Sequence, residues 1–293
     1  MSRPIPPSRR MAVGVLGSVL LTACQAGTPT PTHRVLPPSA SPTQPPATAP
    51  SVTVTGPGLT PQQRLMALAA NIGGTPDDDT SHLPYTYLHV QTWARSTNAI
   101  TRTDLQRWRR NADGSGQEAI RKLPDLSGVN HRPRPEERHL LARSRKTVTR
   151  HARGGLHPHL PEPLPTDPAT LTGLLASREL AAEPGYPRML VHGVVGLAVS
   201  QYLSRDQRAA CLRALADVRG ITYEGGARDV AGRAGLAFKV AAGGSTSTLI
   251  VDARTGELLA AEEQVAGVRP GLFSYYLVLE RGHTAKSGVA LRP

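Results

Sequence analysis

Residues 85–93 read YTYLHVQTW. Its odd-numbered positions carry Tyr, Tyr, His, Gln and Trp, whereas its even-numbered positions carry Thr, Leu, Val and Thr. Strict alternation of this kind is typical of a β-strand whose two faces meet different surroundings. The stretch therefore predicts a strand with one aromatic-rich face.

The residues that follow extend this strand into a meander. Ile100–Arg110 predicts a second strand, the run NADGSG at 111–116 predicts a turn, and Gln117–Lys122 predicts the returning strand. Sequential strands joined by short turns pair antiparallel. We therefore expect an antiparallel sheet in this half of the chain.

Helix signals lie on both sides of the meander. Thr60 followed by Pro61 predicts the start of one helix, and the Gly pair at 73–74 predicts its end. Three more helices are predicted further on: Asp167–Ser177 with Asp167 as N-cap, Arg188–Leu203, and a helix that opens with the capping box Ser204–Gln207 and runs to Val218.

Short strands return after these helices. The turn-bounded, β-like segments are Ile221–Glu224, Ala234–Ala241, Thr246–Asp252, Glu257–Gln264 and Leu272–Glu280, with Gly256 expected at positive φ in a hairpin. Strands, helices and strands in this order, without a βαβ rhythm, predict an α+β fold. We expect a curled antiparallel sheet, similar to a half-barrel, with helices inserted between two groups of strands.

The N-terminus has the pattern of an export signal. Three Arg residues precede Met11–Ala23, which is uncharged and too short to span a bilayer. This run ends LTAC at 21–24, which resembles the bacterial lipobox, so we predict a signal peptide at 1–23 and lipidation of Cys24. An ordinary secretory signal cut near Ala23 or Ala26 is the alternative.

A Pro- and Thr-rich segment follows the predicted lipidation site. Residues 25–60 contain nine Pro, no acidic residue and a single Arg. A segment this poor in apolar side chains cannot offset its own ordering entropy. We therefore predict a lipidated Cys and disordered tether at 24–59, a single α+β domain at 60–293, and a location on the extracytoplasmic face of the cell membrane.

Positive charge concentrates in one part of the chain. The formal net charge is +12, and residues 102–153 hold fourteen Arg or Lys against six acids. We expect a basic insert rich in Pro, His and Arg at about 123–165. It could bind anionic lipid headgroups, an anionic envelope polymer or an acidic protein partner, or it could be a solvated loop without a specific partner. The predicted compartment disfavours nucleic acid.

Two clusters are candidate binding sites. Tyr85, Tyr87, Trp93 and Trp108 are predicted to line a cavity for an apolar or lipid ligand, with a plain hydrophobic core as the alternative. The five His residues of the basic region could bind a metal, but neighbouring cations would repel it, and no metal or other cofactor is predicted. These five are His131, His139, His151, His157 and His159.

Catalytic motifs are absent from the sequence. It contains no nucleophile elbow, no Ser-x-x-Lys and no His-Glu-x-x-His. Cys211 lies among Leu residues at helical spacing, which indicates a buried small apolar residue rather than a nucleophile. No catalytic residue is therefore predicted, and we expect a protein that is not an enzyme.

Taken in order, several of these segments resemble an uncharacterised actinobacterial family of membrane-anchored extracytoplasmic proteins. The segments are Tyr85–Trp93, Trp108–Arg110 with Asp113-Gly114, Leu164–Pro168, Tyr202-Leu203, Gly232-Arg233 and Asp252–Glu257. More distantly, the predicted arrangement resembles periplasmic lipoprotein carriers, lipid-binding lipoproteins and periplasmic regulators of anti-sigma factors. The resemblance implies an exported, anchored domain and carries no established activity.

The leading hypothesis is a membrane-anchored lipoprotein that acts as a non-catalytic extracytoplasmic binding or sensing module, with an apolar or lipid ligand. Two alternatives stay open. One is an extracytoplasmic hydrolase with an unrecognised site, and the other is a protein-interaction component of envelope signalling.

Overall fold

The alternating stretch at 85–93 forms the first three quarters of a long strand in the computed structural model, β1 (Tyr85–Ser96). β2 (Ala99–Arg110) and β3 (Gly116–Ser127) continue the meander, as predicted. The structure describes residues 58–96, 99–127 and 132–291. These lie within one compact unit, Pro50–Pro293, whereas Cys24, the signal peptide and nearly all of the tether are outside the described residues.

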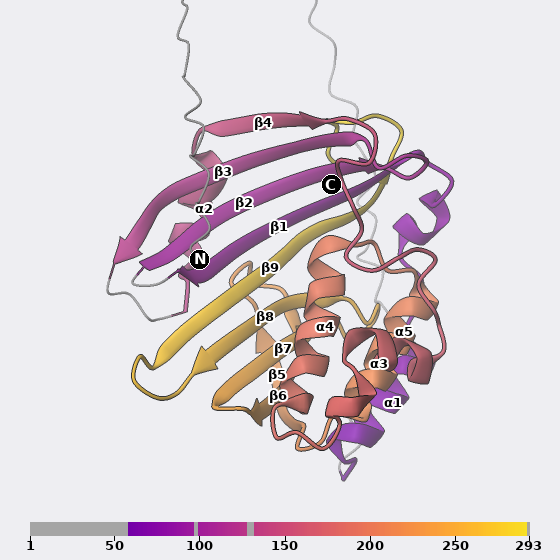
Figure 1. Ribbon diagram of the computed structural model, residues 1–293, viewed down its shortest axis with the longest axis vertical. Coiled ribbons are helices and arrows are strands. Elements are labelled where there is room, and N and C mark those ends of the chain that lie inside the picture. Colours follow the sequence, from indigo (N-terminus) through magenta and orange to yellow (C-terminus); the bar gives the residue numbers. More distant parts are fainter. Residues whose placement is uncertain (1–57, 97–98, 128–131, 292–293) are drawn as a thin grey trace, which may run out of the picture. The chain divides into compact units, whose positions relative to one another are not determined.

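A single sheet of nine strands forms the framework, in the order β4-β3-β2-β1-β9-β8-β7-β6-β5 (Figure 1). All neighbouring pairs are antiparallel. The remaining strands are β4 (Lys146–His151), β5 (Thr222–Arg228), β6 (Ala234–Ala242), β7 (Ser245–Val251), β8 (Leu258–Val265) and β9 (Gly271–Thr284). The sheet does not close, and β4 and β5 are its two edges.

The helices lie between the two groups of strands, as predicted. The chain passes from the edge strand β4 to the opposite edge strand β5 through α3 (Pro168–Leu175), η2 (Arg178–Leu180), α4 (Tyr186–Ser200) and α5 (Arg205–Ala216). The other helices are α1 (Pro61–Asn71), η1 (Pro76–Thr80) and α2 (Pro135–Arg143). β9 then returns to pair with β1, which makes the sheet continuous.

Local sequence signals start these helices. The side chain of Thr60 accepts a hydrogen bond from the backbone of Gln63, and Ser204 and Gln207 form the predicted capping box of α5. Asp167 caps α3 through the backbone N–H of Thr170. These predictions are confirmed because each depends only on residues within one helical turn.

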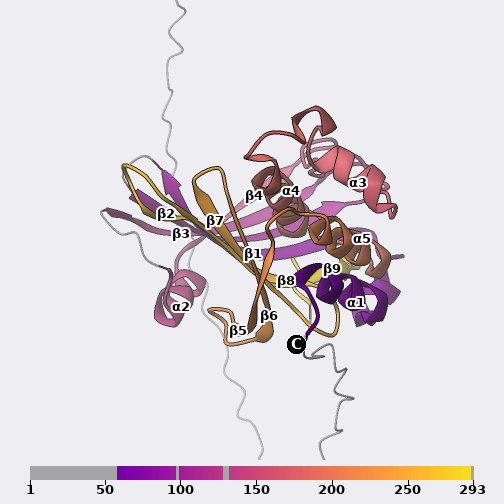
Figure 2. The same cartoon turned by 90° about the horizontal axis from the view of Figure 1, so that it is seen from below.

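Both faces of the sheet are covered, but by different elements. Helices α1, α3, α4 and α5 pack over one face, and α2 packs over the other (Figure 2). Adjacent residues of β7 point to opposite faces of the sheet. Leu249 belongs to the core under α4, and Ile250 belongs to the core that includes Leu141 of α2. The fold is therefore the expected α+β curled sheet. Among the described residues, no helix combines the length and apolar character needed to cross a membrane.

The basic insert at about 123–165 is more ordered than its composition indicated. β3 extends to Ser127, and the segment also holds α2 and the edge strand β4. The sequence left the order of this insert open, because β4 is stabilised by pairing with β3, which a charge-rich sequence does not reveal. His139 lies in α2, His151 lies in β4 and His159 packs against Gly196, and among the described residues no His belongs to a group that could hold a metal ion. His131 is outside the described residues.

Candidate functional site

The four aromatic residues of the predicted ligand cavity are on the face of the sheet that α2 covers. Tyr87 stacks on Trp108 with ring centroids 5.0 Å apart, and Trp93 meets Tyr275 edge to face at 5.9 Å. Trp93 also belongs to the core cluster of Leu141, whereas Tyr85 is only partly buried beside Tyr87. Their predicted contact with a ligand remains a prediction, and the groove described below is lined by other residues.

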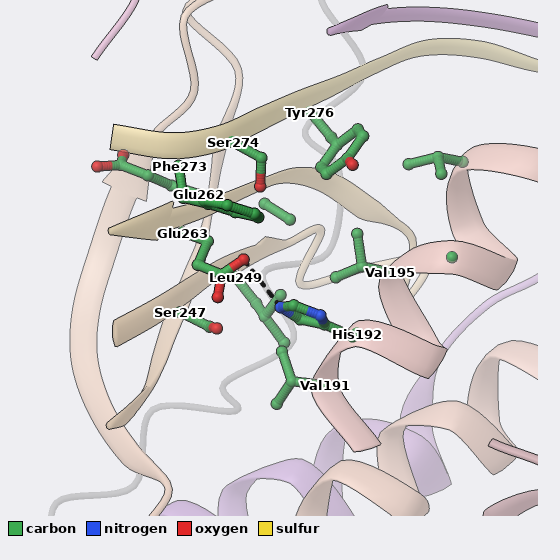
Figure 3. A pocket seen from close by; sticks show the side chains of 13 residues that line it. Val191, His192, Val195, Ser247, Leu249, Glu262, Glu263, Phe273, Ser274 and Tyr276 are labelled. Carbon is green, nitrogen blue, oxygen red and sulfur yellow. Dashed lines mark ion pairs between the residues drawn. The ribbon is translucent and has the colours of Figure 1, made fainter. Parts of the chain in front are cut away.

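A groove lies on the opposite face, between α4 and the strands β7, β8 and β9 (Figure 3). We call it the α4 groove, and its cavity volume is about 180 Å³. One wall is apolar and consists of Val191, Val195 and Val199. These residues follow the four-residue spacing of a helix, so they form one stripe along α4.

Cross-strand pairing builds the floor of the groove from two rows of side chains. In one row Ser247 of β7 pairs with Glu263 of β8, which pairs with Ser274 of β9. In the neighbouring row Leu249 pairs with Ala261, which pairs with Tyr276. Because paired residues point to the same face, the floor has one polar row beside one apolar row.

The polar row carries a buried carboxylate held by two groups of α4. Only 5% of the Glu263 side chain is exposed, its Oε1 accepts from Arg188 Nε at 2.7 Å, and its Oε2 lies 2.9 Å from His192 Nε2. Arg188 and His192 are four residues apart, so they project from the same side of the helix. Burial raises the pKa of Glu263, but the hydrogen bonds and charges of His192 and Arg188 outweigh burial and lower it overall.

Aromatic rings border the groove on the β9 side. Phe273 is 38% exposed, which is unusual for a Phe side chain, and the Arg188 guanidinium lies 6.0 Å from its ring centroid. Tyr276 ends the apolar row, and burial raises the pKa of its hydroxyl. The groove therefore offers an apolar surface next to a fixed cluster of charges.

Close approach of two other segments fixes α4 over the sheet. A Cβ on Gly193 would lie 2.8 Å from Leu175 Cβ at the end of α3, and a Cβ on Gly196 would lie 2.8 Å from the His159 ring. At the end of α4, Gln201 accepts from the backbone N–H of Leu160 at 2.8 Å. Glycine at these two positions lets α3 and the 159–160 segment approach the helix.

The groove does not hold an assembled Ser-His-acid triad. In such a triad one ring nitrogen of His contacts the acid and the other contacts the Ser hydroxyl. His192 uses Nε2 for Glu263, and in Figure 3 its second nitrogen points away from Ser247 and Ser274. Within the described part of the chain, no group of three or more His, Cys, Asp or Glu side chains could hold a metal ion.

The sequence did not predict the charged residues of this groove, Arg188, His192 and Glu263. The usable signal was the pair Arg188 and His192, the only residues of α4 with basic side chains, spaced so that both reach one partner. Glu263 gave no comparable signal, because the adjacent Glu262 has the same residue type and faces Arg132 instead. Only the register of β8 decides which of the two is buried under α4.

Comparisons with known proteins give little further information. No protein-family model matches the chain, and no curated protein matches it. The solved structure of MucB in complex with MucA(peri) resembles it with a TM-score of 0.28 at 14% identity, covering 78% of this chain and 56% of that chain. MucB alone resembles it with a TM-score of 0.29 at 14% identity, covering 81% and 62%.

This is a distant structural resemblance, and the chain spans about 56 to 62% of the length of these two structures. Similarity at this level carries no conclusion about ligand or activity. Membership of the actinobacterial family remains a prediction.

Proposed function

We propose that this protein is an exported, lipid-anchored and non-catalytic binding module, and that its α4 groove binds one apolar group of a ligand. The group is an aromatic or branched side chain of a peptide, or the end of an acyl chain. The observation that carries this proposal is the apolar row of the groove floor, Leu249, Ala261 and Tyr276, next to the ring of Phe273, which is 38% exposed.

The size of the groove limits the ligand. A cavity of about 150 Å³ lined by apolar side chains binds benzene, whereas sites for whole drug-sized ligands measure about 300–1,000 Å³. The α4 groove, at about 180 Å³, suits a single ring or a few methylene groups. This size favours recognition of one apolar group over the enclosure of a whole lipid.

The charged end of the groove orients the ligand. Glu263 is already neutralised by Arg188 and His192, so the cluster carries no unpaired negative charge. Arg188 and His192 remain partly exposed beside the buried carboxylate, so their N–H donors favour a carboxylate or phosphate next to the apolar group. A fatty acid end or a peptide C-terminus combines these two features.

The predicted anchor supports a role at the membrane. Cys24 ends an apolar run in a lipobox pattern, and the tether that follows would hold the domain away from the membrane. The basic balance of the mature chain fits a protein that faces an anionic membrane. A hydrolase is the less favoured alternative, because His192 is held by Glu263 and makes no hydrogen bond to a Ser hydroxyl among the described residues.

The test fills the groove without altering the opposite face. Ser247→Leu adds apolar volume on the floor of the groove, and Thr248→Leu adds the same side chain one residue later, on the other face of β7. Decanoate and N-acetylphenylalanine serve as probes in titration calorimetry with the full chain. We expect Ser247→Leu to weaken binding about tenfold or more and Thr248→Leu to leave it unchanged.

Equal binding by all three proteins would place the ligand elsewhere, and absence of binding of both probes to the unmodified protein would contradict the proposal. Native mass spectra before and after organic extraction give an independent measurement. A lipid that co-purifies with the unmodified protein and not with Ser247→Leu would support an acyl ligand.

A further inference from the structure

Among the strands that the structure describes, the edge strand β4 pairs on one side only. It pairs with β3, and it ends the strand order of the sheet (Figure 1). In an antiparallel ladder the N–H and C=O groups of alternate residues point away from the paired strand. Five of the six β4 residues are exposed, and the sixth, His151, is partly buried beside Glu118. β4 can therefore accept one more strand.

A dense positive charge surrounds this edge. The stretch RSRKTVTRHAR at 143–153 contains five Arg or Lys and no acid. All five are exposed, and we call them the basic edge: Arg143, Arg145, Lys146, Arg150 and Arg153. The first four make no ion pair with any residue that the structure describes, whereas Arg153 interacts electrostatically with Asp113.

The positive charge determines which kind of strand can pair with the free edge of β4. A second copy of the chain would bring its own five cations against the basic edge, and like charges on adjacent strands are destabilising. An acidic segment would instead be attracted, and its carboxylates could pair with Lys146 and Arg150, which make no ion pair among the described residues. The charge therefore favours an acidic segment of a different protein over pairing between two copies.

The register of β4 defines the pattern that such a segment needs. Lys146, Val148 and Arg150 pair with Arg121, Ala119 and Gln117, so they share the face of the sheet that carries Trp108. Val148 is 47% exposed beside the fully buried Ala119. A residue added opposite Val148 would cover this apolar surface. Two positions away on either side, acidic side chains would meet Lys146 and Arg150.

We propose that β4 binds an extended acidic segment of a protein partner by strand addition, with an acid-x-apolar-x-acid pattern opposite Lys146, Val148 and Arg150. Main-chain hydrogen bonds to the free edge supply affinity, and the alternating side chains supply specificity. The surface is separate from the α4 groove, because Lys146, Val148 and Arg150 lie on the opposite face of the sheet.

Two synthetic peptides test the pattern on the full chain. The peptide STETVTETS carries two Glu residues with one Val midway between them, and STTEEVTTS has the same composition with adjacent Glu residues. Fluorescence anisotropy with labelled peptides measures their affinities. We expect the first peptide to bind about tenfold more tightly, because only its two acids can face Lys146 and Arg150 together.

Backbone methylation separates strand addition from simple charge attraction. Methylating the amides of odd-numbered peptide residues, or of even-numbered ones, removes the N–H groups of one side of the strand. We expect one methylated form to lose binding and the other to keep it. Equal binding of both forms, or equal binding of the two peptide sequences, would overturn the proposal.

Reversing the charges of Lys146 and Arg150 tests whether the peptide binds at β4. The variant Lys146→Glu/Arg150→Glu should lose STETVTETS and bind STKTVTKTS, whereas Arg219→Glu/Arg254→Glu, with the same change of net charge at exposed positions away from β4, should keep the original preference. Circular dichroism checks that both variants are folded. If the chain bound phosphatidylglycerol vesicles and neither peptide, the basic edge would be a lipid-binding surface and the proposal would be wrong.

Discussion

Glu263 and His192 connect the sheet to α4, because the Oε2 of Glu263 lies 2.9 Å from the Nε2 of His192. The carboxylate is buried, whereas 42% of the imidazole side chain is exposed. The pair therefore couples the floor of the α4 groove to the solvent at its rim.

The stability of the protein should depend on pH through Glu263. Its pKa is lower in the folded protein than in the unfolded chain, where the pKa of a Glu side chain is about 4.3. The carboxylate therefore contributes stability above pH of about 4.3, and this contribution is lost as the pH falls through the lower folded value. We expect the unfolding free energies of the unmodified protein and Glu263→Gln to differ most near neutral pH and to converge in acid, as measured by urea unfolding.

An exposed carboxylate elsewhere is the control, since Glu183→Gln changes the same residue type outside the groove. Its difference from the unmodified protein should stay small at every pH. A gap between Glu263→Gln and the unmodified protein that widened as the pH fell would contradict the assigned direction.

Asp78→Asn should destabilise the protein strongly. Arg208 is 1% exposed, and its Nη2 lies 2.9 Å from Asp78 Oδ2. Burial raises the pKa of Asp78, but hydrogen bonds from Arg208, Thr75 and Tyr202 lower it well below its ordinary value. Loss of the carboxylate leaves a buried guanidinium charge, which costs about 3–5 kcal/mol of unfolding free energy.

Asp79→Asn gives the matched comparison, because Asp79 is exposed and adjacent in sequence. Thermal unfolding of both variants measures the difference. Similar melting temperatures for Asp78→Asn and Asp79→Asn would mean that the Arg208 pair does not stabilise the fold.

Thiol labelling should report the state of Cys24. Burial raises the pKa of the Cys211 thiol to about 12 and leaves 5% of the residue exposed, so iodoacetamide should not reach it in the folded protein. If Cys24 is lipidated, the full chain from membranes should take no label when folded and one when denatured. Mass spectrometry counts the labels.

The variant Cys24→Ala keeps Cys211, so it should take the same number of labels as the lipidated protein, none when folded and one when denatured. It should no longer fractionate with membranes. One label on the folded, unmodified protein would show a free Cys24 thiol and would argue against the lipid anchor.

Fluorescence should separate the two candidate ligand sites. Trp93 and Trp108 are the two Trp residues of the chain, and both are buried on the face opposite the α4 groove. We expect their emission to change little when decanoate or N-acetylphenylalanine binds. A strong change in emission on binding, abolished by Trp93→Phe or Trp108→Phe, would instead place the ligand at the predicted aromatic site.

The sequence predicted those parts of the fold that depend on local pattern. The alternation at 85–93, the caps at Thr60, Asp167 and Ser204, and the hairpin with Gly256 at φ of 69° all involve residues close in sequence. The pairing of β1 with β9 joins segments far apart along the chain, and no local pattern encodes such a contact. β4 was missed for a similar reason, since its sequence KTVTRH is stabilised as a strand by β3.

The candidate site was less predictable than the fold. Trp and Tyr residues were predicted to contact a ligand, but large aromatic side chains also fill hydrophobic cores. Trp93 and Trp108 are buried in the core of this protein. The α4 groove depends on which face of β8 carries Glu263 and on where α4 crosses the sheet. Both follow from packing between distant segments, so composition and spacing could not reveal them.

A methyl NMR titration of the full chain with decanoate and with N-acetylphenylalanine tests whether ligands bind in the α4 groove. We predict that the methyl signals of Val191, Val195 and Leu249 shift as either ligand is added, while those of Ile250 and Leu259, on the other face of the sheet, stay in place. Shifts confined to Ile250 and Leu259, or no shift of any methyl signal at saturating ligand, would contradict binding in the α4 groove.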